Sequence, residues 1–96
     1  MKPGVLCAKP STGATVLVVS SEMVNLSTYP TVLGLRCKAE EGPGYPFTVP
    51  IGHGLWAYTM TIAPRDKTDL EPDGRRTDSQ AMVNVMNALF RIMRQD

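Results

Sequence analysis

Cysteine, histidine and long apolar runs are all scarce in this sequence, and each scarcity argues against a class of protein. The only cysteines, Cys7 and Cys37, both lie in apolar stretches. Two cysteines are too few for a disulfide framework or a structural zinc site, so we expect buried, reduced thiols and no bound metal. The longest apolar run is 16–19, far short of the roughly 20 residues of a membrane-spanning helix. No apolar leader follows Lys2, so we expect a cytoplasmic protein.

The sequence has no large excess of positive or negative charge, and it also lacks the usual catalytic signatures. The formal net charge is +1, so a site for a polyanion would have to be a local cluster of cations. The sequence contains no phosphate-cradling glycine loop, dinucleotide fingerprint or paired metal-ligand spacing, and we therefore expect no cofactor. The single histidine, His53, stands between two glycines, a setting that favours an exposed turn over a catalytic base.

The length and composition predict one small globular domain that spans residues 1–96. The chain is 43% hydrophobic and 20% charged, a balance that is typical of folded domains rather than disordered chains. A domain of this size buries only a modest share of its apolar surface when it folds alone. Further burial against a second copy would stabilise it, so we expect a homodimer.

Most of the chain has the patterns of β-strands. The β-branched run at 15–19 predicts a central strand that is covered on both faces. Gly34 marks a bulge or a close backbone approach within a later strand. Pro46 and Pro50 lack an N–H group and restrict their strand to an edge of the sheet. The predicted strands are 5–7, 15–19, 31–37, 45–51 and 55–62.

The last of these strands alternates large and small side chains. Trp56 and Tyr58 fall on one face and Ala57 on the other, and the period of two predicts a half-buried strand whose large face points inward. Pro64 is expected to stop this strand. We interpret 65–74 as a charged connector that ends in a turn.

Two helices complete the prediction. Ser20 and Ser21 suit the N-terminal cap of a short helix over 22–26. Thr77 begins a Thr-Asp-Ser-Gln sequence that fits a capping box, so we expect a terminal helix that starts there. That helix carries an apolar stripe, which we interpret as core or interface. The stripe consists of Met82, Val85, Met86, Leu89, Ile92 and Met93. The predicted fold class is therefore mainly β with a C-terminal α-helix.

Cationic and hydroxyl side chains gather at the predicted strand ends. If the sheet closes into a small barrel, these ends meet on one rim and form a phosphate-binding groove. The alternative is that they are ordinary solvated surface charges. The residues are Lys9, Ser11 and Thr12 in the first turn, Arg36, Cys37 and Lys38 after the third strand, and Arg65 and Lys67 in the connector.

The segments of the chain also follow a distinctive order. A proline-glycine opening strand is followed by the aliphatic run 16–21 and by Tyr-Pro-Thr-Val at 29–32. The later Tyr-Pro-Phe-Thr-Val-Pro-Ile at 45–51, Gly-Leu at 54–55 and the connector 66–70 keep the same order up to the last helix. In order and spacing, over nearly the whole chain, these segments resemble the MazF/PemK family of ribonuclease toxins.

The resemblance implies a small SH3-like barrel of about five to six strands with a short helix and a terminal helix. It also implies a homodimeric toxin that cleaves single-stranded RNA without a metal, inhibits translation and is controlled by a cognate antitoxin protein. Such cleavage uses the ribose 2′-hydroxyl as the nucleophile, so the protein supplies proton transfer and positive charge at the phosphorus. The family's arginine position falls on Ala14 here, and its threonine position falls on Cys37.

We therefore predict that Lys9 and Arg36 supply the catalytic positive charge and that Cys37, with a reference pKa of ~8.5, donates a proton. The remaining predicted RNA-binding residues are Lys38, Ser11, Thr12, Thr15, Arg65 and Lys67. A competing hypothesis is a toxin of the same fold that is not a nuclease and binds a protein target such as gyrase, as in the CcdB branch. A third is a plain structural barrel subunit.

Overall fold

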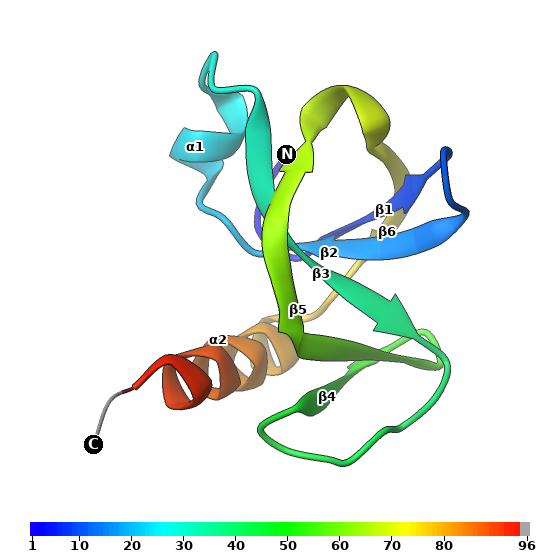
Figure 1. Cartoon of the computed structure of the whole chain (residues 1–96), viewed down its shortest axis with the longest axis vertical. Coiled ribbons are helices and arrows are strands. Elements are labelled where there is room, and N and C mark those ends of the chain that lie inside the picture. Colours follow the sequence, from blue (N-terminus) through cyan, green and yellow to red (C-terminus); the bar gives the residue numbers. More distant parts are fainter. Residues whose placement is uncertain (95–96) are drawn as a thin grey trace.

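The computed structural model describes residues 1–94, which form one antiparallel sheet, two α-helices and a 3-10 turn (Figure 1). The predicted fold class, mainly β with a C-terminal helix, is confirmed. In chain order the elements are β1 Val5–Lys9, β2 Ala14–Val18, α1 Glu22–Leu26, β3 Thr31–Lys38, β4 Thr48–Gly52, β5 Leu55–Asp66, the 3-10 turn η1 Lys67–Asp69, β6 Glu71–Arg76 and α2 Ser79–Met93.

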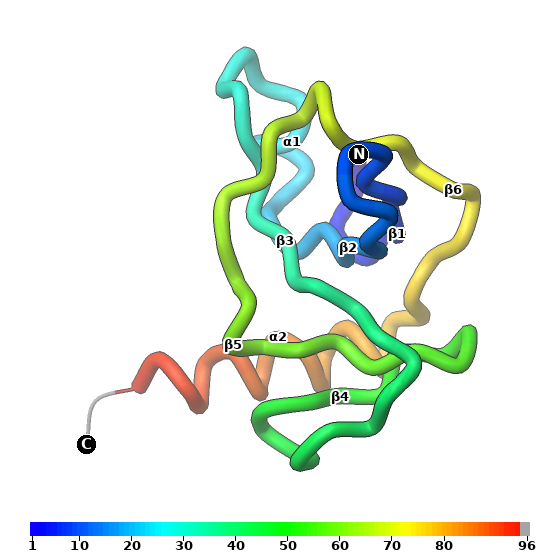
Figure 2. The backbone as a smooth tube through the Cα atoms, turned by 45° about the vertical axis from the view of Figure 1, so that its right-hand side comes forward, coloured from blue at the N-terminus to red at the C-terminus, as the bar shows by residue number. Residues whose placement is uncertain are grey.

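The six strands lie in the order β4-β5-β3-β2-β1-β6 and curl into a half-barrel (Figure 2). The two edge strands, β4 and β6, are brought together by the turn after β4. His53 in that turn has a φ of 57° and lies exposed, as predicted. Its Nε2 atom lies 3.0 Å from the carbonyl oxygen of Arg76 at the end of β6. The hydrogen bond therefore links the two ends of the sheet.

The sheet carries a core on each face. On the face toward α2, Leu6, Leu17 and Leu35 pack with buried residues of the helix. On the opposite face, Cys7 and Val16 pack within a second, smaller cluster. The prediction that the run at 15–19 is covered on both sides is therefore confirmed, and so is the prediction of two buried, free cysteines.

The structure corrects three of the strand predictions. β5 continues through Pro64 to Asp66, because β4 pairs only with the first half of β5 and leaves the second half an edge that tolerates a missing N–H. The segment 71–74, expected to be a turn, is part of the edge strand β6, which runs on to Arg76. β4 begins at Thr48 instead of residue 45, after a cis peptide bond between Tyr45 and Pro46.

The inward face of β5 was also predicted wrongly. Ala57 and Thr59 are fully buried, whereas Trp56 and Tyr58 are only partly buried and Met60 is 68% exposed. Ala57 belongs to the core cluster that includes α2. A small side chain at this position lets the helix approach the sheet closely, so the period of two was right and the direction was reversed.

The helices lie where they were expected, with one correction. α1 is capped by Ser21, whose hydroxyl accepts a hydrogen bond from the Val24 N–H. α2 is capped by Asp78, whose carboxylate accepts a 2.8 Å hydrogen bond from the Ala81 N–H. The predicted cap, Thr77, lies one residue earlier and is buried.

The predicted apolar stripe of α2 divides into two faces. Val85 and Leu89 are buried against the sheet, and Met82 and Ile92 pack at the margin of the same core. Met86 and Met93 instead point outward, in an exposed row with Val83 and Phe90. One face of α2 is therefore core, as predicted, and the other is an unpartnered apolar surface. No helix within residues 1–94 is both long and apolar enough to cross a membrane.

Candidate functional site

Four of the predicted cations lie on one face of the sheet, the face that points away from α2. Residues that pair across neighbouring strands share a face, and side chains alternate along each strand. Lys9 pairs with Ala14 in β2, and Val16, two positions further along, pairs with Arg36 in β3. Lys38 lies two positions beyond Arg36, and Arg65 pairs with Val32 of the same strand. We call Lys9, Arg36, Lys38 and Arg65 the cationic face.

The register places Lys9 and Lys38 on either side of Ala14. Thr15 pairs with Cys37, so the next position of β3, Lys38, lies opposite Ala14. Neighbouring strands are about 4.8 Å apart, which places the backbones of β1 and β3 about 10 Å from each other at this level. The long side chains of two lysines at this separation can reach one phosphate group from opposite sides, with the small Ala14 side chain leaving space between them.

The contacts of the cations differ from one another. Lys38 is exposed, and its ammonium lies 4.9 Å from the centre of the Tyr58 ring. Lys9 is half-buried, and its ammonium lies 3.8 Å from Asp69. Arg36 is exposed. Lys38 and Arg36 are thus open to a ligand, while Lys9 is held at the margin of the cationic face.

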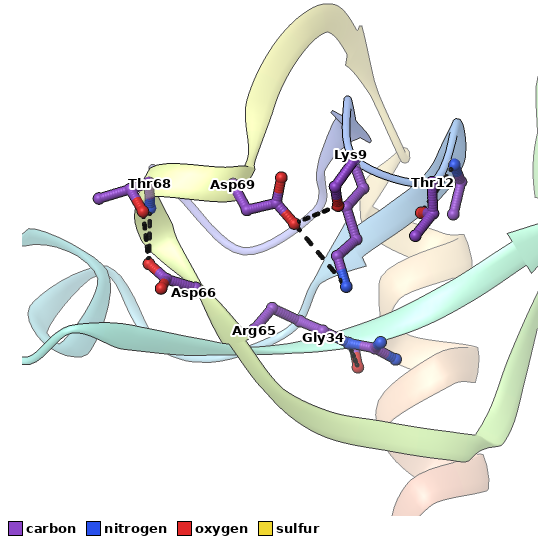
Figure 3. Close-up of polar contacts among 9 residues, drawn as sticks. Lys9, Thr12, Gly34, Arg65, Asp66, Thr68 and Asp69 are labelled. Atoms are coloured by element: carbon purple, nitrogen blue, oxygen red, sulfur yellow. Dashed lines mark hydrogen bonds and ion pairs between the residues drawn. The ribbon is translucent and has the colours of Figure 1, made fainter.

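Arg65 is fixed by a corner in β5. Gly34 pairs with Ala63 and Arg36 with Tyr58, so two positions along β3 correspond to five along β5. The Arg65 guanidinium donates a 2.7 Å hydrogen bond to the Thr61 carbonyl and a longer one to the Gly34 carbonyl. Figure 3 shows Arg65 lying across Gly34, with Lys9 reaching toward the same stretch of β3 from β1.

Thr61 also supports the backbone of Arg36 at this corner. Its hydroxyl accepts a 2.8 Å hydrogen bond from the Arg36 N–H and donates a 2.6 Å hydrogen bond to the Tyr58 carbonyl. Gly34 is required here, since a Cβ atom would lie 2.5 Å from a methyl group of Val16 and 3.0 Å from Arg65. The prediction of a bulge or close approach at Gly34 is confirmed.

The predicted hydroxyl residues of the first turn lie beside Lys9. Ser11 donates a 2.7 Å hydrogen bond to the carboxylate of Asp69, the residue that also contacts Lys9. Thr12 accepts a hydrogen bond from the Ala14 N–H and shapes the turn (Figure 3). Asp69 thereby ties the loop between β1 and β2 to η1.

Three predicted site residues do not join the cationic face. Thr15 and Cys37 pair with each other on the face toward α2. Burial raises the pKa of the Cys37 thiol to about 12, so the expectation of a proton donor near neutrality is wrong. The Lys67 ammonium donates hydrogen bonds to the carbonyls of Val24 and Ser27, at the end of α1, and acts as a cap for that helix.

Sequence reasoning missed three residues of this region. Trp56 and Tyr58 pair with Lys38 and Arg36 and therefore share their face. Tyr58 donates a 2.7 Å hydrogen bond to the Glu40 carbonyl, which anchors the loop after β3. The alternation in β5 identified this pair, but it could not indicate which side the helix covers. Asp69 gave no sequence signal beyond its place in a charged connector.

The chemistry available on the cationic face is positive charge. Within residues 1–94, no three histidine, cysteine, aspartate or glutamate side chains gather closely enough to hold a metal ion. Ammonium and guanidinium groups on one surface favour a phosphate ligand and stabilise negative charge that develops on it.

Only the comparison with solved structures finds proteins similar to this chain, and it shows the fold. No family model and no curated protein matches the sequence. A chain of the crystal structure of MazE-MazF (Form-I) from Deinococcus radiodurans matches with a TM-score of 0.82 and 16% identity, over 97% of this chain and 95% of that one. A chain of the Form-II crystal structure matches with a TM-score of 0.79 and 18% identity, over 97% and 94%. This chain therefore shares the fold of proteins in MazE-MazF complexes, as the sequence resemblance implied.

Proposed function

We propose that this protein is the toxin of a toxin-antitoxin system, a metal-independent endoribonuclease that cleaves single-stranded RNA in the cytoplasm and so inhibits translation. The observation that carries the proposal is the placement of Lys9, Arg36 and Lys38 on one face of a fold found in MazE-MazF complexes. The two free thiols are consistent with a reducing compartment.

In the proposed reaction the scissile phosphate lies over Ala14, between Lys9 and Lys38. The 2′-hydroxyl of the RNA attacks the adjacent phosphorus and releases its proton to solvent. The bond from phosphorus to the 5′ oxygen breaks, which leaves a 2′,3′-cyclic phosphate and a 5′-hydroxyl. Positive charge on Arg36 and the lysines stabilises the phosphorane, and the exposed Lys38 ammonium protonates the departing oxygen. Asp69 is a positioning residue that holds Lys9 and Ser11.

The test is cleavage of an unstructured RNA by the purified protein in the presence of a chelator. Wild type should generate new 5′ ends, and the combined Lys9→Ala, Arg36→Ala and Lys38→Ala protein should not. Arg91→Ala is the matched control, because Arg91 is an exposed cation in the last turn of α2. Equal cleavage by the triple variant and wild type would contradict the assignment.

We propose that a cognate antitoxin protein binds and inhibits this chain. The support is the fold, since the matched chains come from structures that pair MazF with MazE. Expression of the chain should arrest growth, and co-expression of its antitoxin should relieve the arrest. Arrest that no neighbouring small gene relieves would count against a paired system.

One observation favours a second function, a non-nuclease toxin that binds a protein target such as gyrase. Ala14 stands where the resemblance places an arginine, and Cys37, at the threonine position, is buried. Mapping of RNA 5′ ends after expression separates the two functions. Growth arrest with new 5′ ends supports the nuclease, whereas arrest without them supports a protein target.

A further inference from the structure

Trp56 is the only tryptophan in the chain, and the fold does not use it to fill the core. It belongs to neither of the two clusters of buried apolar side chains within residues 1–94, and it is not among the side chains that pack at their margins. It is only partly buried, and its indole N–H makes no hydrogen bond in that part of the chain. A large aromatic ring in this situation is available to contact a ligand.

The register of the sheet places Trp56 on the cationic face, level with the two lysines. Lys38 of β3 pairs with Trp56 of β5, which pairs in turn with Pro50 of β4. Residues that pair across neighbouring strands share a face. One line across five strands therefore carries Lys9, Ala14, Lys38, Trp56 and Pro50. We call these five residues the cross-strand line.

The neighbours of Trp56 leave its ring uncovered. The Lys38 ammonium lies over the ring of Tyr58, 4.9 Å from its centre, and no other cation of the described chain lies over an aromatic ring. Pro50, on the other side, is exposed and has a short, rigid side chain that does not extend over the indole. Trp56 is thus the open aromatic ring of the cross-strand line.

Tyr58, the other aromatic residue of this face, is already engaged. Its hydroxyl donates a 2.7 Å hydrogen bond to the Glu40 carbonyl. The loop after β3 also lies against its ring, since a Cβ atom added to Gly42 would be 3.2 Å from a ring carbon of Tyr58. Tyr58 therefore supports the loop and the Lys38 side chain, and Trp56 is left to meet a ligand.

The position of Trp56 suits a base that is attached close to the scissile phosphate. In the proposed reaction that phosphate lies over Ala14. Two strand spacings separate Ala14 from Trp56, about 10 Å, and Lys38 lies between them. A nucleotide whose phosphate is held by the lysines can extend its ribose and base along the cross-strand line to the indole. Cations for the phosphates beside an aromatic ring for a base form the arrangement by which proteins hold single-stranded nucleic acid.

We infer that Trp56 is a stacking platform for one base of the RNA and that it makes this protein select single strands over duplexes. Stacking on an aromatic side chain requires a base whose flat face is open, and in a duplex both faces are covered by neighbouring base pairs. The cations cannot make this distinction, because both forms of RNA carry phosphates. The inference rests on the proposed function in one respect, that the ligand is RNA.

The first test uses the fluorescence of Trp56, which as the sole tryptophan reports on this ring alone. The probe is a single-stranded oligoribonucleotide of about ten nucleotides, with every 2′-hydroxyl methylated so that it cannot be cleaved. Stacking of a base should quench the emission as the probe binds. An abasic oligomer of the same length keeps the phosphates, and a duplex of the same sequence keeps the bases covered. Both should leave the emission nearly unchanged.

The second test measures the affinity for the same probe by fluorescence anisotropy of an end label. Trp56→Ala should weaken binding about 5- to 150-fold, the usual contribution of one stacked base, and should leave duplex binding unchanged. Trp56→Phe keeps an aromatic ring and should recover most of the affinity. Tyr29→Ala is the matched control, because Tyr29 is 64% exposed but lies beside α1, and it should bind as wild type does. Circular dichroism should show all three variants folded.

Three results would overturn the inference. They are a probe that binds without quenching, a Trp56→Ala variant that binds the probe as tightly as wild type, and a loss of affinity that is equal for the single strand and the duplex. Cleavage is measured separately on unmodified RNA. Quenching without cleavage contradicts only the proposed function, and cleavage that Trp56→Ala leaves unaltered contradicts only this inference. Failure to bind any of the oligonucleotides contradicts both.

Discussion

The two faces of the sheet differ in what their residues do. On the face toward α2, Leu17 and Leu35 are fully buried and pack with the helix, so the residues there hold the fold together. On the opposite face, Arg36 and Lys38 are exposed beside a small buried cluster that includes Val16. Substitutions on the face toward α2 should therefore lower stability, and substitutions on the cationic face should lower activity.

The largest expected effect is on stability. Leu17→Ala removes a fully buried side chain from the central strand β2 and leaves a cavity between the sheet and α2. The free energy of unfolding should fall by about 2–5 kcal/mol in urea titrations. Leu33→Ala is the control, because Leu33 is 42% exposed, and its effect should be much smaller. Equal losses for the two variants would show that the central strand is not the core of the fold.

The next effect tests the cationic face. Arg36→Ala should lower kcat/KM for RNA cleavage by about 100-fold, the usual cost of removing one group that stabilises a developing negative charge. Its unfolding free energy should stay within about 0.5 kcal/mol of wild type, because the side chain is exposed. If the loss of activity is explained by a matching loss of stability, the cationic face does not differ from the face toward α2 in the way proposed.

Gly34→Ala tests a position that should affect both stability and RNA cleavage. The added methyl group would overlap Val16 and press on Arg65, so we expect a loss of about 1–3 kcal/mol in unfolding free energy. Because Arg65 must move, RNA cleavage should also fall. Pairing this change with Val16→Ala, which makes space for the methyl group, should restore part of the stability. A single variant as stable as wild type would contradict the close approach.

The smallest effect is a pH dependence from the core of the α2 face. Burial raises the pKa of the Cys37 thiol to about 12 from 9.0. The unfolded chain therefore releases this proton first, so the stabilisation is complete below about pH 9 and is lost as the pH rises toward 12. Burial also raises the pKa of Cys7, which acts in the same direction. Between pH 9 and pH 10 the Cys37 thiol alone should cost about 1 kcal/mol.

The control for this pH dependence is Cys37→Ala. The variant should lose part of the slope in urea titrations above pH 9 and leave the slope below pH 8 unchanged. Rapid alkylation of Cys37 by iodoacetamide in the native protein near pH 8 would show that the thiol is accessible and would contradict its burial.

The sequence predicted the elements that local patterns define. The β-branched run at 15–19 and the turn glycines marked β1 to β5 near their true positions, and α2 was found from its apolar period. β6 was missed because its Pro72 and Gly74 are typical of turns, and only its place at the edge of the sheet permits them. The direction of β5 was missed because small residues such as Ala57 become buried when a helix packs closely against them.

The candidate site was predicted at the level of segments and not of single residues. Cations at the strand ends were identified, but the face that each one occupies depends on the register between strands, which is a property of the whole sheet. A difference of one residue separates Cys37, which is buried, from Lys38, which is exposed. The role of Lys67 at the end of α1 could not be predicted for a similar reason, since its partners there are 40 or more residues away in the chain.

The corner of β5 affects which mutations this protein can tolerate during evolution. Because β5 uses five positions where β3 uses two, the segment 59–62 determines whether Arg65 emerges on the same side as Arg36. Losing a single residue from this segment would rotate everything after it by half a turn and carry Arg65 to the interior. Exchange of one amino acid for another is therefore tolerated at this corner far more readily than any alteration in its length.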